Sequence, residues 1–237
     1  MLHHLTTLHQ PQTIEEALEL LTQPGTYPLY AGGLVRTNAP DVKAAVLLNS
    51  CGLTQISAND GRLYVGGAAT LESIRTFCLT LSGAAPASLA EILRQELPLG
   101  LRNGLALGDI LTESRPASPL RTLLVALGDR VILHTHPISA GWLFRMLELR
   151  LDQPIDRAAF GFEKVARSPA DAPIVCAVVW HENSVERSAV GGLLPDPVIY
   201  QPDLPSQYED YLGSAEYRSA IAPILVKRAS DRARSMA

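Results

Sequence analysis

A pair of glycines directly after a short apolar run constrains the fold of this chain more than any other feature. The run 27–29 has strand character, and Gly32 and Gly33 follow it closely. Ahead of the run, residues 13–21 predict an amphipathic helix that opens with capping-box spacing. Glycines lack a Cβ, so backbone N–H groups at such a strand end can approach an anion such as a pyrophosphate. A plain tight turn is the alternative, and it stays open because glycine pairs are frequent in turns.

The composition indicates a chain with a substantial core and no general affinity for nucleic acid. Of the 237 residues, 47% are hydrophobic and 19% are charged; the net charge is −4 and the pI is near 5.9. An acidic chain without a basic block is not expected to bind nucleic acid. We expect no signal peptide and no membrane span, because no apolar run approaches roughly 18 residues. The three cysteines, Cys51, Cys78 and Cys176, are widely spaced, which predicts reduced thiols in a cytoplasmic protein.

Hydrophobic periodicity and turn signals predict a mixed α/β chain. Strands are expected at 42–48, 62–66, 130–134, 162–167 and 174–180. Helices are expected at 13–21, 71–75, 87–94, 120–127, 142–149 and 210–229. The tripeptide Asn59-Asp60-Gly61 predicts a hairpin turn, and four prolines between 195 and 205 predict an extended linker or edge segment.

A second glycine-bearing segment spans residues 101–110 and ends in Ala106-Leu107-Gly108-Asp109-Ile110. Thr70 stands where it can cap the helix that follows it. Lys164 lies in a predicted strand, where a plain surface lysine is the alternative to a functional one. No Ser/His/Asp, Cys/His or paired-carboxylate arrangement suggests hydrolytic catalysis, so no catalytic residue and no metal ligand is predicted.

Taken in order, these segments resemble the flavin-binding medium subunit of the molybdenum hydroxylases. That family includes the carbon monoxide dehydrogenase medium subunit and the flavin domain of xanthine dehydrogenase. No single segment is specific, but their colinear order along nearly the whole chain is. The segments that carry the resemblance are 14–21, 31–33, 63–71, 101–103, 123–133, 162–167 and 213–218.

The resemblance implies an α/β (α+β) fold of the p-cresol methylhydroxylase type, which binds FAD between two lobes. It assigns residues 1–55 to an N-terminal α/β lobe and residues 56–160 to a middle lobe. Residues 161–237 would form a small C-terminal lobe of antiparallel strands and helices, similar to the C-terminal domain of the carbon monoxide dehydrogenase flavoprotein.

The resemblance also implies a function and a set of cofactor-binding residues. The chain would be an electron-transfer subunit whose FAD takes electrons from [2Fe–2S] clusters and passes them to an external acceptor. Its partners would be a molybdopterin-binding large subunit and a [2Fe–2S] small subunit. Two glycine turns would hold the pyrophosphate, and a lysine would lie near the flavin. The residues assigned to FAD are Ala31, Gly32, Gly33, Leu34, Val35, Arg36, Thr70, Ala106, Gly108, Asp109 and Lys164.

Several positions depart from the family pattern. Leu34 replaces a usual threonine, Asp109-Ile110 replaces Gly-Asn, and Ser118-Pro119 replaces a Ser-Asp pair that contacts the nucleotide. A carboxylate about 4 Å from a phosphate charge costs on the order of 4 kcal/mol at an effective dielectric constant near 20. Asp109 could also point away from the phosphates as an ordinary turn residue. The alternatives are therefore a flavin-free structural subunit of such a complex and a binding protein for another nucleotide.

Overall fold

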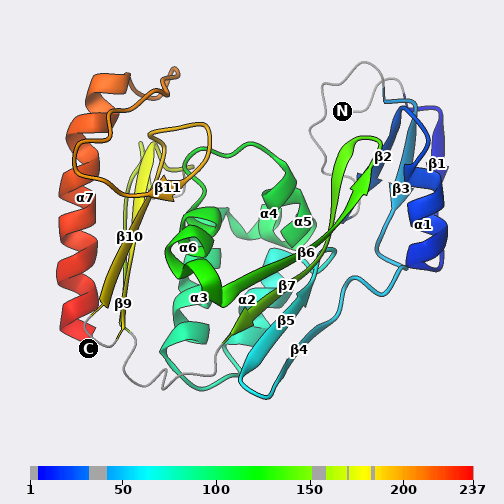
Figure 1. The fold of residues 1–237 in the computed structure, drawn as a ribbon, viewed down its shortest axis with the longest axis horizontal. Coiled ribbons are helices and arrows are strands. Elements are labelled where there is room, and N and C mark those ends of the chain that lie inside the picture. The colour runs from blue at the N-terminus through cyan, green and yellow to red at the C-terminus, as the bar shows by residue number, and fades with distance from the viewer. Residues whose placement is uncertain (1–4, 32–41, 151–158, 170, 183–184, 237) are drawn as a thin grey trace. The chain divides into compact units, whose positions relative to one another are not determined.

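The computed structural model describes residues 5–31, 42–150, 159–169, 171–182 and 185–236 (Figure 1). It divides into two compact units that are interleaved along the chain. The first unit consists of Met1–Ile74, Leu99–Glu113 and Ile132–Arg150. The second consists of Arg75–Pro98, Ser114–Val131 and Leu151–Ala237. The three continuous lobes expected from the sequence, 1–55, 56–160 and 161–237, stay a prediction.

The first unit contains a three-stranded parallel sheet with strand order β1-β3-β2. Its elements are β1 (Thr7–His9), α1 (Ile14–Leu21), β2 (Thr26–Leu29) and β3 (Ala44–Leu47). Helix α1 forms where the sequence predicts it, because Thr13 Oγ1 accepts the Glu16 N–H at 3.2 Å and caps its start. Pairing of β2 with β3 leads the chain directly to Tyr30 and Ala31 at the carboxyl end of β2.

The same unit contains a four-stranded antiparallel sheet with strand order β4-β5-β7-β6. Its strands are β4 (Ile56–Asn59), β5 (Arg62–Gly66), β6 (Val131–Ile138) and β7 (Gly141–Arg150). The predicted hairpin between β4 and β5 is confirmed, since Asp60 and Gly61 have φ of 48° and 68° as a tight hairpin turn requires.

The helix expected at 142–149 is wrong, because these residues form strand β7. Leucine, methionine, glutamate and arginine favour helices locally, but β7 pairs antiparallel with β5. That pairing places Leu147 and Leu149 opposite Val65 and Leu63, where all four side chains are buried. Tertiary pairing therefore overrides the local helix propensity.

Three short helices complete the description of the first unit and lead into the second. They are α2 (Leu71–Cys78), α4 (Leu99–Gly104) and α5 (Leu107–Thr112). The side chain of Arg102 on α4 donates to Glu72 on α2 at 2.7 Å, and both side chains are largely buried. This ion pair fixes the segment that leads to α5.

The second unit is an antiparallel sheet with helices against it, in strand order β11-β10-β9-β8. Its strands are β8 (Ala159–Val165), β9 (Val175–Glu182), β10 (Val185–Gly191) and β11 (Val198–Ile199), and its helices are α3 (Ala84–Glu96), α6 (Pro119–Leu127) and α7 (Ala215–Met236). Helix α6 packs against β9 and β10, whereas α7 packs against β8 and β9. The proline-rich stretch after residue 195 contains β11, an edge strand of the kind expected there.

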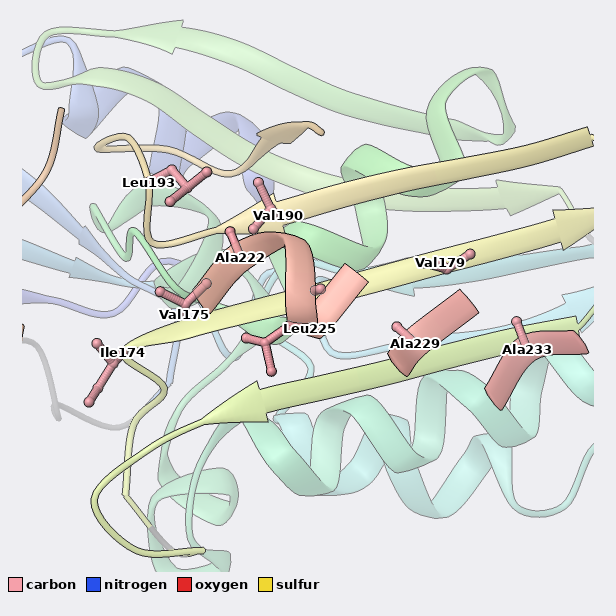
Figure 2. Close-up of a cluster of buried hydrophobic side chains, with 10 residues drawn as sticks. Ile174, Val175, Val179, Val190, Leu193, Ala222, Leu225, Ala229 and Ala233 are labelled. Atoms are coloured by element: carbon pink, nitrogen blue, oxygen red, sulfur yellow. The ribbon is translucent and has the colours of Figure 1, made fainter. Parts of the chain in front are cut away.

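The core between α7 and the sheet is built mainly from small and β-branched side chains, together with Leu193 and Leu225 (Figure 2). Alternate residues of β9, Val175, Ala177 and Val179, face Ala222, Leu225 and Ala229 of α7 within this cluster. A Cβ on Gly161 of β8 would lie 1.7 Å from the Ala229 carbonyl oxygen. Only glycine therefore allows α7 to lie so close to β8.

Candidate functional site

The first glycine segment is described only at its start. Ala31 follows β2 and is buried, whereas the candidate residues Gly32, Gly33, Leu34, Val35 and Arg36 lie outside the described residues. Tyr30, immediately before Ala31, is 1% exposed, and its hydroxyl oxygen accepts the Phe144 N–H at 2.6 Å. The strand that leads into this segment is thus anchored on β7.

The end of the second glycine segment forms the first turn of the helix α5, and its residues 106–110 are buried. Helix α5 begins at Leu107, so Gly108 and Asp109 are helical, and Ile110 is fully buried. Asp109 is 5% exposed, and its Oδ2 accepts the Ala106 N–H at 2.8 Å. The carboxylate therefore folds back onto its own helix terminus, as the acidic residue of a capping box does.

The next two N–H groups of this turn are also bonded within the chain. Leu107 N–H donates to the Ala69 carbonyl at 2.9 Å, and Gly108 N–H donates to the Gly67 carbonyl at 2.8 Å. These carbonyls come from the segment that follows β5. Three successive backbone donors of the turn that the resemblance places at a pyrophosphate are therefore satisfied by protein groups.

Gly108 has a packing reason to be glycine. A Cβ at this position would lie 2.3 Å from both Cδ1 and Cε1 of Tyr30. The ring of Tyr30 therefore rests directly on the α5 backbone. This contact brings the residue before Ala31 against the second glycine segment.

Thr70 caps the next helix and touches the same segment. Its Oγ1 accepts the Ser73 N–H at 3.2 Å, and its backbone forms an antiparallel bridge with Ala106. The predicted helix-capping role of Thr70 is confirmed. The structure thus gathers Thr70, Ala106, Gly108 and Asp109 in one cluster of the first unit.

Lys164 lies on β8 of the second unit. Its Nζ donates to the Pro169 carbonyl at 3.0 Å, which ties the ammonium group to the loop after β8. Burial lowers the pKa of this amine, and the positive charge of Arg94 acts in the same direction. The described contacts of Lys164 are those of a lysine that holds a loop.

One buried acidic residue of the second unit was not predicted from the sequence. Glu96, the last residue of α3, is 4% exposed, and its Oε2 accepts both the Ser118 hydroxyl at 3.0 Å and the Leu120 N–H at 2.8 Å. Burial raises the pKa of Glu96, although these hydrogen bonds oppose the rise. No local pattern marks this residue, because its partners lie 22 and 24 positions further along the chain.

The first turn of α5 fits a pyrophosphate poorly. The donors of Ala106, Leu107 and Gly108 are engaged by protein acceptors, and one of these acceptors is itself a carboxylate. A pyrophosphate at this turn would have to displace the Asp109 side chain while remaining near its negative charge. Among the described residues there is no group of three or more metal-ligating side chains, and no described helix has the length and apolar character needed to cross a membrane.

The fold is found in chains of known molybdenum enzymes. No protein-family model matches the sequence, and neither does any curated protein. By structure, the chain is similar to one of carbon monoxide dehydrogenase from Hydrogenophaga pseudoflava, at 16% identity over 98% of both chains with a TM-score of 0.83. It is similar to one of carbon monoxide dehydrogenase from Oligotropha carboxidovorans, at 17% identity over 98% of both chains and 0.82. Quinoline 2-oxidoreductase from Pseudomonas putida 86 contains another, at 17% identity over 97% of both chains and 0.76. The fold class predicted from the sequence is confirmed.

Proposed function

We propose that this chain is a subunit of a multi-subunit oxidoreductase of the molybdenum hydroxylase type. The proposal is supported by a likeness that spans 97–98% of this chain and of chains from carbon monoxide dehydrogenase and quinoline 2-oxidoreductase. Its partners in the proposal are a molybdopterin-binding large subunit and a [2Fe–2S] small subunit, which the sequence resemblance implies.

Within that complex, we propose a structural role without flavin. The observation that carries this choice is the first turn of α5, where Asp109 accepts the Ala106 N–H at 2.8 Å. A helix terminus that already holds a carboxylate has little left to offer a pyrophosphate, and charge repulsion near 4 Å costs on the order of 4 kcal/mol at an effective dielectric constant of 20. The chain would then keep the shape that its partners recognise.

FAD-dependent electron transfer is the second candidate. It is favoured by the full-length fold likeness to chains of redox enzymes. Under this reading the chain would bind FAD through residues of the first glycine segment and pass electrons from the clusters to an external acceptor. The two candidates share their partners and differ only in the flavin.

Purification of the complex from its native cells decides between them. A tag on this chain should recover a large molybdopterin subunit and a cysteine-rich small subunit, identified by mass spectrometry. Flavin released by heat should amount to far less than one FAD per copy, even when FAD is added throughout purification. One FAD per copy would establish the electron-transfer candidate. A chain recovered alone, without either partner, would overturn the complex itself.

A further inference from the structure

Glu96 closes the N-terminus of α6 from inside the second unit. Its carboxyl group is almost fully buried at the end of α3, and both of its described hydrogen bonds go to residues at the start of α6. A buried carboxyl group is costly unless its oxygens are hydrogen-bonded. Here the N-terminal donors of a nine-residue helix supply those bonds.

Every donor in the first turn of α6 is accounted for. Pro119 has no N–H, and the Leu120 N–H is bonded to Glu96. The Arg121 N–H donates to Ser118 Oγ at 3.1 Å, and the Thr122 N–H donates to the Ser118 carbonyl at 3.0 Å. The start of this helix therefore offers no backbone hydrogen bond to an outside anion.

We propose that the Glu96 carboxyl group is a resident ligand of the α6 N-terminus and keeps external anions out of it. Ser118-Pro119 is where the sequence resemblance places contacts to the nucleotide half of FAD, so the inference deepens the proposed flavin-free role and rests on it for its functional meaning. The second unit would thus complete its own fold with a side chain, at a place where a nucleotide-binding relative would use its cofactor.

The charges around Glu96 are arranged to hold a carboxyl group there. The positive charges of Arg115 and Arg121 lower the pKa of Glu96, and the charge of Glu96 raises the pKa of Lys164 on β8. Cys176 on β9 also interacts with it, and burial raises the pKa of that thiol to about 12, so it stays neutral. The surroundings therefore favour an acidic group over an empty or apolar one.

Chemical rescue tests this assignment on the full chain. Glu96→Ala removes a fragment of the size of acetate and leaves Ser118 Oγ and the Leu120 N–H facing a hole. We expect its Tm to fall by about 5–10 °C, since a buried hydroxyl and a buried N–H group lose their acceptor. Sodium acetate should restore part of this loss in a saturable way, relative to sodium chloride at equal ionic strength.

The matched control is Glu91→Ala on the same helix, where the side chain is about half exposed and bonds to Arg94. It should show neither the Tm loss nor an acetate-specific rise, and the same holds for the parent. If Glu96→Ala melts with the parent, or if acetate acts no better than chloride, the assignment is wrong. If Glu96→Ala is not recovered folded, Glu96→Gln, Ser118→Ala and their combination replace it. Their Tm losses must then be non-additive, and simple additivity overturns the assignment.

This test and the test of the proposed function fail separately. Acetate rescue depends only on the α3–α6 contact, whereas the flavin content of the purified complex depends on the whole chain. If acetate rescues Glu96→Ala and the complex contains one FAD per copy, the assignment of Glu96 is supported and the flavin-free role is overturned. If acetate does not rescue the variant and the complex is flavin-free, the assignment of Glu96 is overturned and the flavin-free role is supported.

Discussion

Helices α5 and α6 begin with the same device, built in two different ways. At α5 the carboxylate comes from Asp109 and reaches the Ala106 N–H three residues back. At α6 the acceptor is the carboxyl group of Glu96 on another helix, which reaches Ser118 and Leu120, more than twenty residues away. A helix start can thus be completed by its own first turn or by tertiary packing. The contact at α5 joins residues close together in the sequence, whereas the contact at α6 forms only once the chain has folded.

The largest effect is expected from restoring the family pattern at α5. Asp109→Gly combined with Ile110→Asn removes the cap and puts an amide at a position that is 0% exposed. We expect a loss of about 4 kcal/mol in unfolding free energy, because truncating a buried isoleucine costs 2–5 kcal/mol and the cap adds about 1. Urea denaturation measures it.

The control for that substitution is Asp109→Asn, which keeps the shape and one acceptor oxygen at the cap. It should cost about 1 kcal/mol or less. If the double variant instead unfolds at the same urea concentration as the parent, Asp109 does not hold the start of α5 and the two helix starts are not alike.

A smaller loss is expected from Gly108→Ala, which tests whether α5 is also locked by packing. The added Cβ would meet the Tyr30 ring at 2.3 Å, so one of the two must move. Overpacking of this kind costs about 2–3 kcal/mol. Gly100→Ala on α4 is the matched control, since a Cβ there meets nothing within 4 Å. Thermal melts of both variants should separate clearly, and equal melts would contradict the described contact between Tyr30 and α5.

The smallest effect is a pH dependence that only the α6 device should have. Burial raises the pKa of Glu96, so the folded chain holds a proton at pH values where the unfolded chain has released it. The stability linked to this group is therefore fully present below the ordinary glutamate pKa and is lost as the pH rises through the raised value. Each unit of pKa difference corresponds to about 1.4 kcal/mol.

The measurement is the difference in unfolding free energy between the parent and Glu96→Gln, followed from pH 8 down to pH 4.5. The parent should gain on the variant as the pH falls. A constant difference would mean that the Glu96 carboxyl group titrates as an ordinary one, and its burial in the α3–α6 corner would then be wrong.

Much of the fold could be predicted because its signals are local. Thr13 marks the start of α1, and Asp60-Gly61 fixes the hairpin between β4 and β5. Strand β7 could not be predicted, because its residues favour a helix and only pairing with β5 makes them a strand. When a segment has a composition that suits either a helix or a strand, pairing with a neighbouring strand decides its structure. Periodicity along the sequence does not reveal that pairing.

In the candidate site, too, the features with local signals could be predicted and the long-range contacts could not. Asp109 stood out in the sequence as an acidic residue in a glycine-bearing segment, and the structure places it at a helix start. The packing of Tyr30 on Gly108 and the reach of Glu96 to Ser118 depend on residues far apart in the chain. No spacing rule connects such residues, so the reason why these donors are engaged became visible only in the folded molecule.

The interleaving of the two units has a consequence for how the protein is made. Helices α3 and α6 belong to the second unit. The strands β8 to β11 and helix α7 of the same unit are synthesised later, after residue 158. After α6 has been synthesised, roughly a hundred residues must still be added before α7 is complete, which takes roughly 5–20 s at ordinary translation rates. During that interval the apolar faces of α3 and α6 have no sheet to cover them. The second unit can therefore complete its core only late in synthesis, whereas two consecutive domains could fold one after the other.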